Sequence, residues 1–74
     1  MVAIEDIQRI NSLILACKAR IALQKALIDD LERRKQPTFV ARDVLKRLTD
    51  SLFQAEHHRR SLLKKSRGAF EPVR

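Results

Sequence analysis

Apolar side chains recur every three or four residues along the first half of the chain, which is the spacing of one helix face. Four isoleucines fall seven residues apart, and the heptad positions between them are also mostly apolar: Ile7, Ile10, Ile14, Cys17, Ile21, Gln24, Ile28 and Leu31. Strand alternation fits poorly, because Ala, Leu, Lys and Arg dominate and no turn residue interrupts the run. The pattern predicts a coiled-coil-like helix over about residues 2–35.

A second helical pattern begins after Pro37 and has its own apolar seam. Proline disfavours helix in the residue before it, and the hydroxyl of Thr38 suits the N-cap of a new helix. The seam alternates spacings of four and three residues: Ala41, Leu45, Leu48, Leu52, Ala55, Arg59 and Leu62. Gly68 is a stop signal, and no periodicity follows it. We therefore predict a helix over about residues 39–66 and a frayed tail over residues 68–74.

A short turn between two long helices predicts an all-α fold in which residues 1–67 form an antiparallel two-helix hairpin. Counting outward from Gln36 places residues opposite each other in layers: Leu31 with Ala41, Ile28 with Leu45, Gln24 with Leu48, Ile21 with Leu52, Cys17 with Ala55, Ile14 with Arg59, and Ile10 with Leu62. Most of these layers are apolar on both sides, which favours this pairing.

The charges favour the same pairing. At the turn end, Asp29, Asp30 and Glu32 would lie near Arg42, Lys46 and Arg47. At the open end, Glu5 and Asp6 would lie near Lys64, Lys65 and Arg67. Acids at a helix start and bases at a helix end also suit the helix dipole. We expect these exposed pairs to select the antiparallel arrangement more than to stabilise it.

A hairpin of this size leaves apolar side chains uncovered, which predicts a partner. The surplus consists of Leu13, Leu15, Leu23, Leu27, Val44, Phe53 and Leu63. A chain of 74 residues buries little surface alone, and with one cysteine it has no internal disulfide to stabilise it. We predict a homodimer that forms a four-helix bundle, with a tetramer as an alternative. The predicted oligomer interface is Ile7, Ile14, Ile21, Gln24, Ile28, Leu45, Leu48 and Leu52.

Two polar residues interrupt the predicted seams. Gln24 is either a selector of register and partner, as buried amides are in coiled coils, or a position at a dimer edge that reaches water. Arg59 either displaces the seam toward Leu62 and Leu63, or lays its stem along the core and keeps its charge in water. We favour the second interpretation for Arg59 and leave both open for Gln24.

The chain is basic, with a formal net charge of +7, so acidic partners enter the picture. One cluster stands opposite an uncharged part of the first helix and is a candidate anion or nucleic-acid patch: His57, His58, Arg59, Arg60 and Lys64. Nucleic-acid binding needs such charge on one accessible face. No run of aromatic residues accompanies the bases, and the helices are too long for a helix-turn-helix motif.

Candidate chemistry is sparse. Adjacent helical residues point about 100° apart, so His57 and His58 cannot chelate one ion from one face. Cys17 within about a turn of His58 is the remaining pair for metal binding or nucleophilic catalysis. A cysteine in an apolar seam is more typical of a buried hydrophobic residue. We expect no metal, no cofactor, no small-molecule substrate and no enzymatic activity.

Residues 17–63 resemble a group of short, uncharacterised alphaproteobacterial proteins that are common in rhizobia. The first helix of that group has the form I-A-x-Q-[KR]-x-x-I-x-x-L-E-R. It is matched by Ile21, Gln24, Lys25, Ile28, Leu31, Glu32 and Arg33. The second part, T-x-x-A-R-x-x-L-x-x-L-x-x-S-L with an HR-containing end, is matched by Thr38, Ala41, Arg42, Leu45, Leu48, Ser51, Leu52, His58 and Arg59. The linker departs from the group, because RRKQPT stands where a glycine-containing turn is expected. The resemblance implies a small all-helical protein without an assigned activity.

These observations lead to one main hypothesis and one alternative. The main hypothesis is a non-enzymatic helical protein that acts by self-association and by binding a protein partner, whose identity the sequence does not give. The alternative is a small basic nucleic-acid-binding protein that uses the end of the second helix. The acidic start MVAIED resembles no export signal, and no apolar run is long enough to span a bilayer. A single thiol fits a reducing compartment, so we expect a cytoplasmic location.

Overall fold

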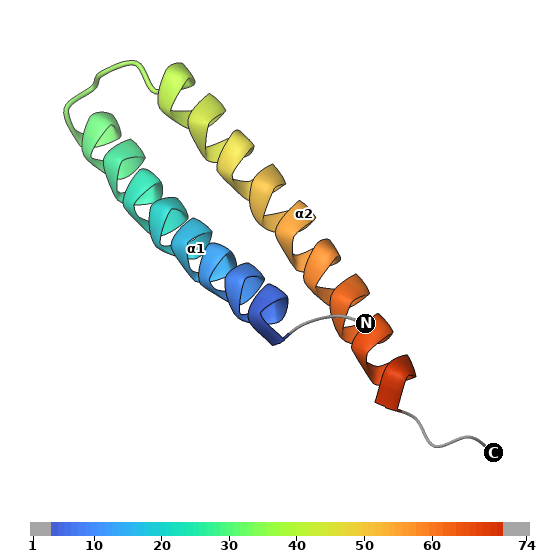
Figure 1. Cartoon of the computed structure of the whole chain (residues 1–74). Coiled ribbons are helices and arrows are strands. Elements are labelled where there is room, and N and C mark those ends of the chain that lie inside the picture. The colour runs from blue at the N-terminus through green and yellow to red at the C-terminus, as the bar shows by residue number, and fades with distance from the viewer. Residues whose placement is uncertain (1–3, 71–74) are drawn as a thin grey trace.

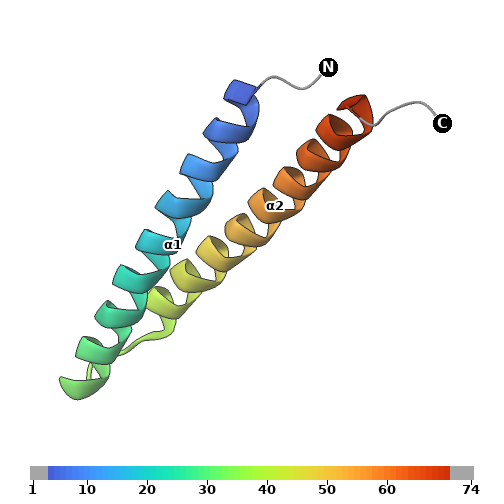
Figure 2. The same cartoon turned by 90° about the horizontal axis from the view of Figure 1, so that it is seen from below.

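The protein is a hairpin of two long helices. The computed structural model describes the backbone of residues 4–70 and the side chains of residues 4–65. Helix α1 spans Ile4–Arg33 and helix α2 spans Phe39–Phe70. The two helices lie side by side and run antiparallel (Figures 1 and 2). The molecule is a rod of 63 × 16 × 14 Å. The predicted all-α hairpin is confirmed, although residues 2 and 3 of the predicted first helix lie outside the described part of the chain.

Neither helix, within the residues that the structure describes, combines the length and the apolarity that crossing a membrane requires.

Helix α2 ends later than predicted. It runs through Gly68 to Phe70, and Gly68 does not adopt a positive φ. A glycine inside a helix costs about 1 kcal/mol relative to alanine, which is not enough to end a helix without a second signal. The interpretation of Gly68 as a stop signal, and of residue 66 as the helix end, is therefore wrong. Residues 71–74 of the predicted frayed tail lie outside the described residues.

Helix α1 ends in a Schellman motif that is built without glycine. The backbone N–H of Gln36 donates to the carbonyl of Leu31 (2.8 Å), and the N–H of Lys35 donates to the carbonyl of Glu32 (3.0 Å). These are the two hydrogen bonds that define the motif. Its third element is a left-handed residue, here Lys35 with φ of 56°. Lys35 thus occupies the position where a glycine was expected in the linker.

Arg42 joins the start of α2 to the end of α1. The carbonyl of Thr38 accepts the backbone N–H of Arg42 (2.8 Å), which makes Thr38 the N-cap. The hydroxyl of Thr38 accepts a hydrogen bond from Nε of Arg42 (3.0 Å), where we expected a backbone N–H as the donor. The same guanidinium forms an ion pair with Glu32. One of the charge pairings predicted for the turn end is therefore confirmed.

The core lies along the predicted seam. Five buried residues come from α1 and two from α2: Ile10, Ile14, Cys17, Ile21, Ile28, Ala41 and Ala55. The leucines at the α2 seam positions are half-buried: Leu45, Leu48, Leu52 and Leu62. Branched side chains of α1 thus pack against an α2 stripe in which two positions, Ala41 and Ala55, carry only small side chains. Every buried residue is one that the heptad pattern placed at a seam.

The layers within this seam differ from the predicted ones. Nε2 of Gln24 donates a hydrogen bond to the carbonyl oxygen of Ala41 (2.9 Å), although counting placed Gln24 opposite Leu48. Ala55 packs in one cluster with Ile10 and Ile14. The predicted partner of Ala55 was Cys17, one to two helical turns farther along α1. Relative to the predicted layers, both contacts show α2 displaced in the same direction along α1, by at least about one helical turn.

The turn explains the displacement. Counting from Gln36 assumed that every residue, helical or not, advances the chain by the same distance along the hairpin. Residues 36–38 are not helical. Non-helical chain can advance up to about 3.3 Å per residue, against 1.5 Å in a helix. Three such residues carry the start of α2 about one helical turn farther back along α1 than residue counting predicts.

The left-handed Lys35 generates a prediction about stability. A residue with a Cβ pays about 1 kcal/mol in this conformation, whereas glycine does not. Glycine also raises the entropy of the unfolded chain, which reduces the gain. We expect Lys35→Gly to raise the free energy of unfolding by up to about 1 kcal/mol, measured by thermal and urea unfolding followed by circular dichroism at fixed protein concentration.

The matched control is Lys25→Gly, an exposed lysine inside α1. It should lower the free energy of unfolding by about 1 kcal/mol. If both variants lose stability equally, Lys35 does not hold the left-handed conformation.

Candidate functional site

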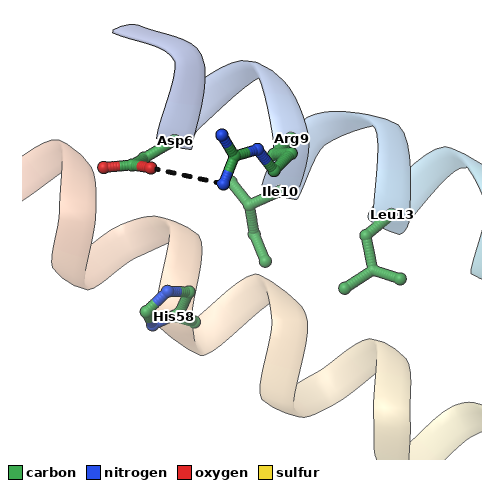
Figure 3. Close-up of a pocket in the computed structure, with 5 residues that line it drawn as sticks. All are labelled: Asp6, Arg9, Ile10, Leu13 and His58. Atoms are coloured by element: carbon green, nitrogen blue, oxygen red, sulfur yellow. Dashed lines mark ion pairs between the residues drawn. The ribbon is translucent and has the colours of Figure 1, made fainter. Parts of the chain in front are cut away.

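One shared hollow and one ion pair show which side of α1 adjoins which side of α2. Leu13 and His58 line one open hollow on one side of the seam (Figure 3). Glu32 and Arg42 form their ion pair on the other side. Helical positions recur at spacings of three and four, so each of these residues marks a row along its helix. The two sides of the hairpin can therefore be compared row by row.

The side marked by Leu13 and His58 is apolar toward the turn and at the Leu13 end. We call it the apolar flank and define it by Leu13, Ala16, Leu23 and Leu27 of α1 and by Val40 and Val44 of α2. Leu13, Leu27 and Val44 remain 49%, 45% and 39% exposed. Arg20 interrupts the α1 row near its middle, and the α2 row is polar from Arg47 onward, through Ser51 and Gln54 to His58. Val40 was not among the predicted surplus residues, although its spacing of four from Val44 was the signal.

The opposite side is charged. Glu32 marks an α1 row that includes Lys25 and Asp29, and Arg42 marks an α2 row that includes Glu56. The same side also carries apolar residues of the predicted surplus: Leu15 stands two heptads before Asp29, Phe53 stands three residues before Glu56, and Leu63 stands seven after it. The hairpin thus presents one apolar flank and a second side on which charged and apolar residues are mixed.

All eight predicted interface residues lie along the seam between α1 and α2. Ile14, Ile21 and Ile28 are buried by the other helix of the same chain. The remaining five are half-buried: Ile7, Gln24, Leu45, Leu48 and Leu52. Within one chain these residues close the hairpin, and their contact with a second copy stays a prediction.

Gln24 has a defined role inside the hairpin. It is half-buried, and its amide nitrogen donates to the backbone of α2 at Ala41. This geometry does not match the other interpretation of Gln24, in which its amide simply reaches water. A net contribution of about 1 kcal/mol is typical of such a hydrogen bond. The bond ties one position of α1 to one position of α2, so it supports the interpretation of Gln24 as a selector of register.

The predicted anion patch separates into two parts. His57, Arg60 and Lys64 line one hollow with Ser61. Arg59 and Arg60 line a neighbouring hollow together with Glu56 and Leu63. Arg60 belongs to both hollows, so these four basic residues form one continuous surface. We call His57, Arg59, Arg60 and Lys64 the basic surface.

His58 points elsewhere. It lies across from α1, in the hollow lined by Asp6, Arg9, Ile10 and Leu13 (Figure 3). It is therefore not part of the basic surface. Arg59 is exposed although it occupies a seam position, so its charge remains in water as we expected.

No acid neutralises the basic surface through an ion pair in the part of the chain whose side chains are described. The ion pairs found there join Asp6 to Arg9 (3.9 Å), Asp30 to Arg34 (3.2 Å), Asp43 to Arg47 (3.1 Å) and Glu32 to Arg42. Asp6 thus pairs within its own helix, where we predicted Lys64 or Lys65 as its partner. The register shift explains this, because it moves the end of α2 past the start of α1 (Figure 1). The side chain of Arg67 lies outside the described ones.

Cys17 and His58 are not brought together. Cys17 is buried in the seam, only 4% exposed, and it does not line the hollow that contains His58. Within the described residues, no group of three or more His, Cys, Asp or Glu side chains could hold a metal ion. The geometry therefore directs attention to the two surfaces, the apolar flank and the basic surface.

Comparisons with protein-family models, curated proteins and solved structures found no match. The resemblance of residues 17–63 to the rhizobial group stays a prediction.

The Gln24 hydrogen bond gives a testable prediction. Gln24→Glu keeps the size of the side chain but places a carboxylate oxygen against the carbonyl of Ala41. We expect a loss of about 1–3 kcal/mol in the free energy of unfolding at pH 7, measured by urea unfolding. Gln54→Glu, at an exposed α2 position, is the control and should change stability by less than about 0.5 kcal/mol. Equal effects of the two substitutions would show that the bond to Ala41 contributes nothing.

Proposed function

We propose that this chain is a non-enzymatic association module of the cytoplasm whose first partner is a second copy of itself. The observation that carries the proposal is the apolar flank. Leucines and valines from both helices line one side of the seam and remain 39–72% exposed in the single hairpin. Exposed apolar side chains gathered on one side are typical of an association surface.

The energetics of a two-helix hairpin support the proposal. Each helix can bury one stripe against the other, and no large side chain among the described residues is fully buried. A single layer of this kind gives a small core and a marginal domain. A second hairpin laid over the apolar flank adds a second layer of packing and converts two stripes into the interior of a four-helix bundle.

A second copy is the occupant that the flank fits best. The flank contains apolar side chains from both helices, so a two-fold axis can place α1 of one copy against α2 of the other. Arg20 and Arg47 interrupt the flank, and their long aliphatic stems can cover apolar surface while the charges stay in water. In such a bundle, the half-buried seam leucines of α2 would face the interior. Further protein partners would bind to the assembled bundle.

The test is the oligomeric state of flank variants. We expect the wild-type chain to sediment as a dimer at micromolar concentration. Leu13→Glu combined with Leu27→Glu places charges on the flank and should weaken association at least a hundredfold, because each buried leucine contributes about 1.5–3 kcal/mol. Sedimentation equilibrium measures the dissociation constant.

Leu15→Glu is the matched control. Leu15 is an α1 leucine that is 68% exposed but lies off the flank, so its replacement should leave the dimer intact. A wild-type chain that is folded and monomeric at micromolar concentration contradicts the proposal, as does equal dissociation by the control.

A further inference from the structure

The last described turns of α2 carry a charge that the hairpin does not use. Over residues 56–65 the side chains include four lysines and arginines and two histidines against one acid, Glu56. The described ion pairs engage Arg9, Arg34, Arg42 and Arg47, all of which lie outside this segment. Its basic side chains are exposed. Like charges gathered in this way repel one another, and an anionic partner would relieve the repulsion.

The basic surface has the geometry of a ladder along the helix. His57, Arg60 and Lys64 stand at i, i+3 and i+7, which places them on one face over roughly 10 Å of helix. Ser61 is half-buried between them and adds a hydroxyl to the same hollow. Arg59 extends the surface sideways through Arg60, in a hollow that Glu56 and Leu63 also line, and no described ion pair joins Glu56 to either arginine. A linear row of cations with a hydroxyl donor matches a linear polyanion better than a single small anion.

Phosphates of a nucleic-acid strand offer such a linear array. Along duplex DNA each strand carries one phosphate per 3.4 Å of axis, so about 10 Å of helix faces roughly three of them. Arginine, lysine and serine are side chains that contact phosphate oxygens, and such contacts carry no sequence information. Phe53, one turn before His57 on the same helix face, is exposed and adds an aromatic surface beside the row.

An anionic membrane is the competing polyanion, and the structure favours it less. Interfacial helices carry apolar residues beside their bases, so that the apolar face enters the lipid. Here the main apolar surface, the flank from Leu13 to Val44, lies on a different side of α2 from His57, Arg60 and Lys64. Beside the bases themselves, Phe53 and the 39% exposed Leu63, which lines a hollow with Arg59 and Arg60, offer little area for insertion.

We propose that the basic surface binds the phosphate backbone of nucleic acid without reading its sequence, through Arg59, Arg60 and Lys64 with His57 and Ser61 beside them. This goes beyond self-association and does not depend on it, because the surface and the apolar flank are different faces of the hairpin. His58, which shares its hollow with Asp6 and Arg9, takes no part.

The experiment measures fluorescence anisotropy of labelled random-sequence duplex DNA and RNA between 50 and 200 mM salt. Three charged contacts predict a slope of log affinity against log salt of about −2.7 for duplex DNA per bound copy, which is about a 40-fold loss over this range. Arg60→Gln combined with Lys64→Gln should reduce the slope by about 2 and lower the affinity at 50 mM salt at least tenfold.

The control removes the same charge from the other end of the molecule, through Lys25→Gln combined with Arg33→Gln. It should keep the wild-type slope and lose less than about threefold in affinity. Circular dichroism of both double variants checks the helices, and His58→Gln should bind as the wild-type chain does. If the Arg60/Lys64 pair loses helicity, Arg59→Gln alone serves in its place, with an expected slope change of about 1.

Several results overturn the inference. They are no binding at 50 mM salt, binding that does not respond to salt, or equal losses in the two double variants, which would reduce the effect to net charge. Capture by vesicles rich in anionic lipid, without nucleic-acid binding, assigns the surface to membranes instead. Because the variants do not touch the apolar flank, sedimentation of the same samples separates this outcome from a failure of the self-association proposal.

Discussion

The packing of one isoleucine-rich stripe of α1 against a narrower stripe of α2 is the contact on which the rest of the structure depends. All the buried residues belong to it, and every other feature is placed by its position relative to it. Two helices can bury one stripe each, so the side chains on either edge of the seam must stay accessible. One edge is apolar over its half nearer the turn, and the other mixes charged and apolar residues. The division of the surface into faces is therefore a direct consequence of packing only two helices.

The register of that packing is set at the turn, and the turn is a matter of backbone geometry. Lys35 takes the left-handed conformation that closes the Schellman motif, and the three non-helical residues that follow carry the start of α2 back along α1. The hydrogen bond from Gln24 to Ala41 holds the resulting alignment. This alignment sets His58 in one hollow with Asp6 and Arg9 of α1.

The sequence could predict what depends on helical periodicity and could not predict what depends on the turn. The two helices, the seam and the pairing of Glu32 with Arg42 follow from spacing and charge, and the structure confirms them. The layers were wrong, because residue counting treats helical and non-helical residues as equal steps. The predicted helix end at Gly68 was wrong, because a helix tolerates an interior glycine at a modest cost in stability. The separation of His58 from His57 follows from the 100° between helical neighbours, but which neighbour faces α1 required the register.

The two proposed surfaces would act together, because a dimer formed through the apolar flank carries two copies of the basic surface. A single hairpin offers a few phosphate contacts, which give weak binding at physiological salt. A dimer formed through the apolar flank holds two basic surfaces in one rigid body. Binding of the first surface then raises the effective concentration of phosphates at the second, if the geometry lets both reach one nucleic acid. In such an assembly the salt dependence doubles per bound dimer, so the steepness of the binding curve reports the oligomeric state that engages the nucleic acid.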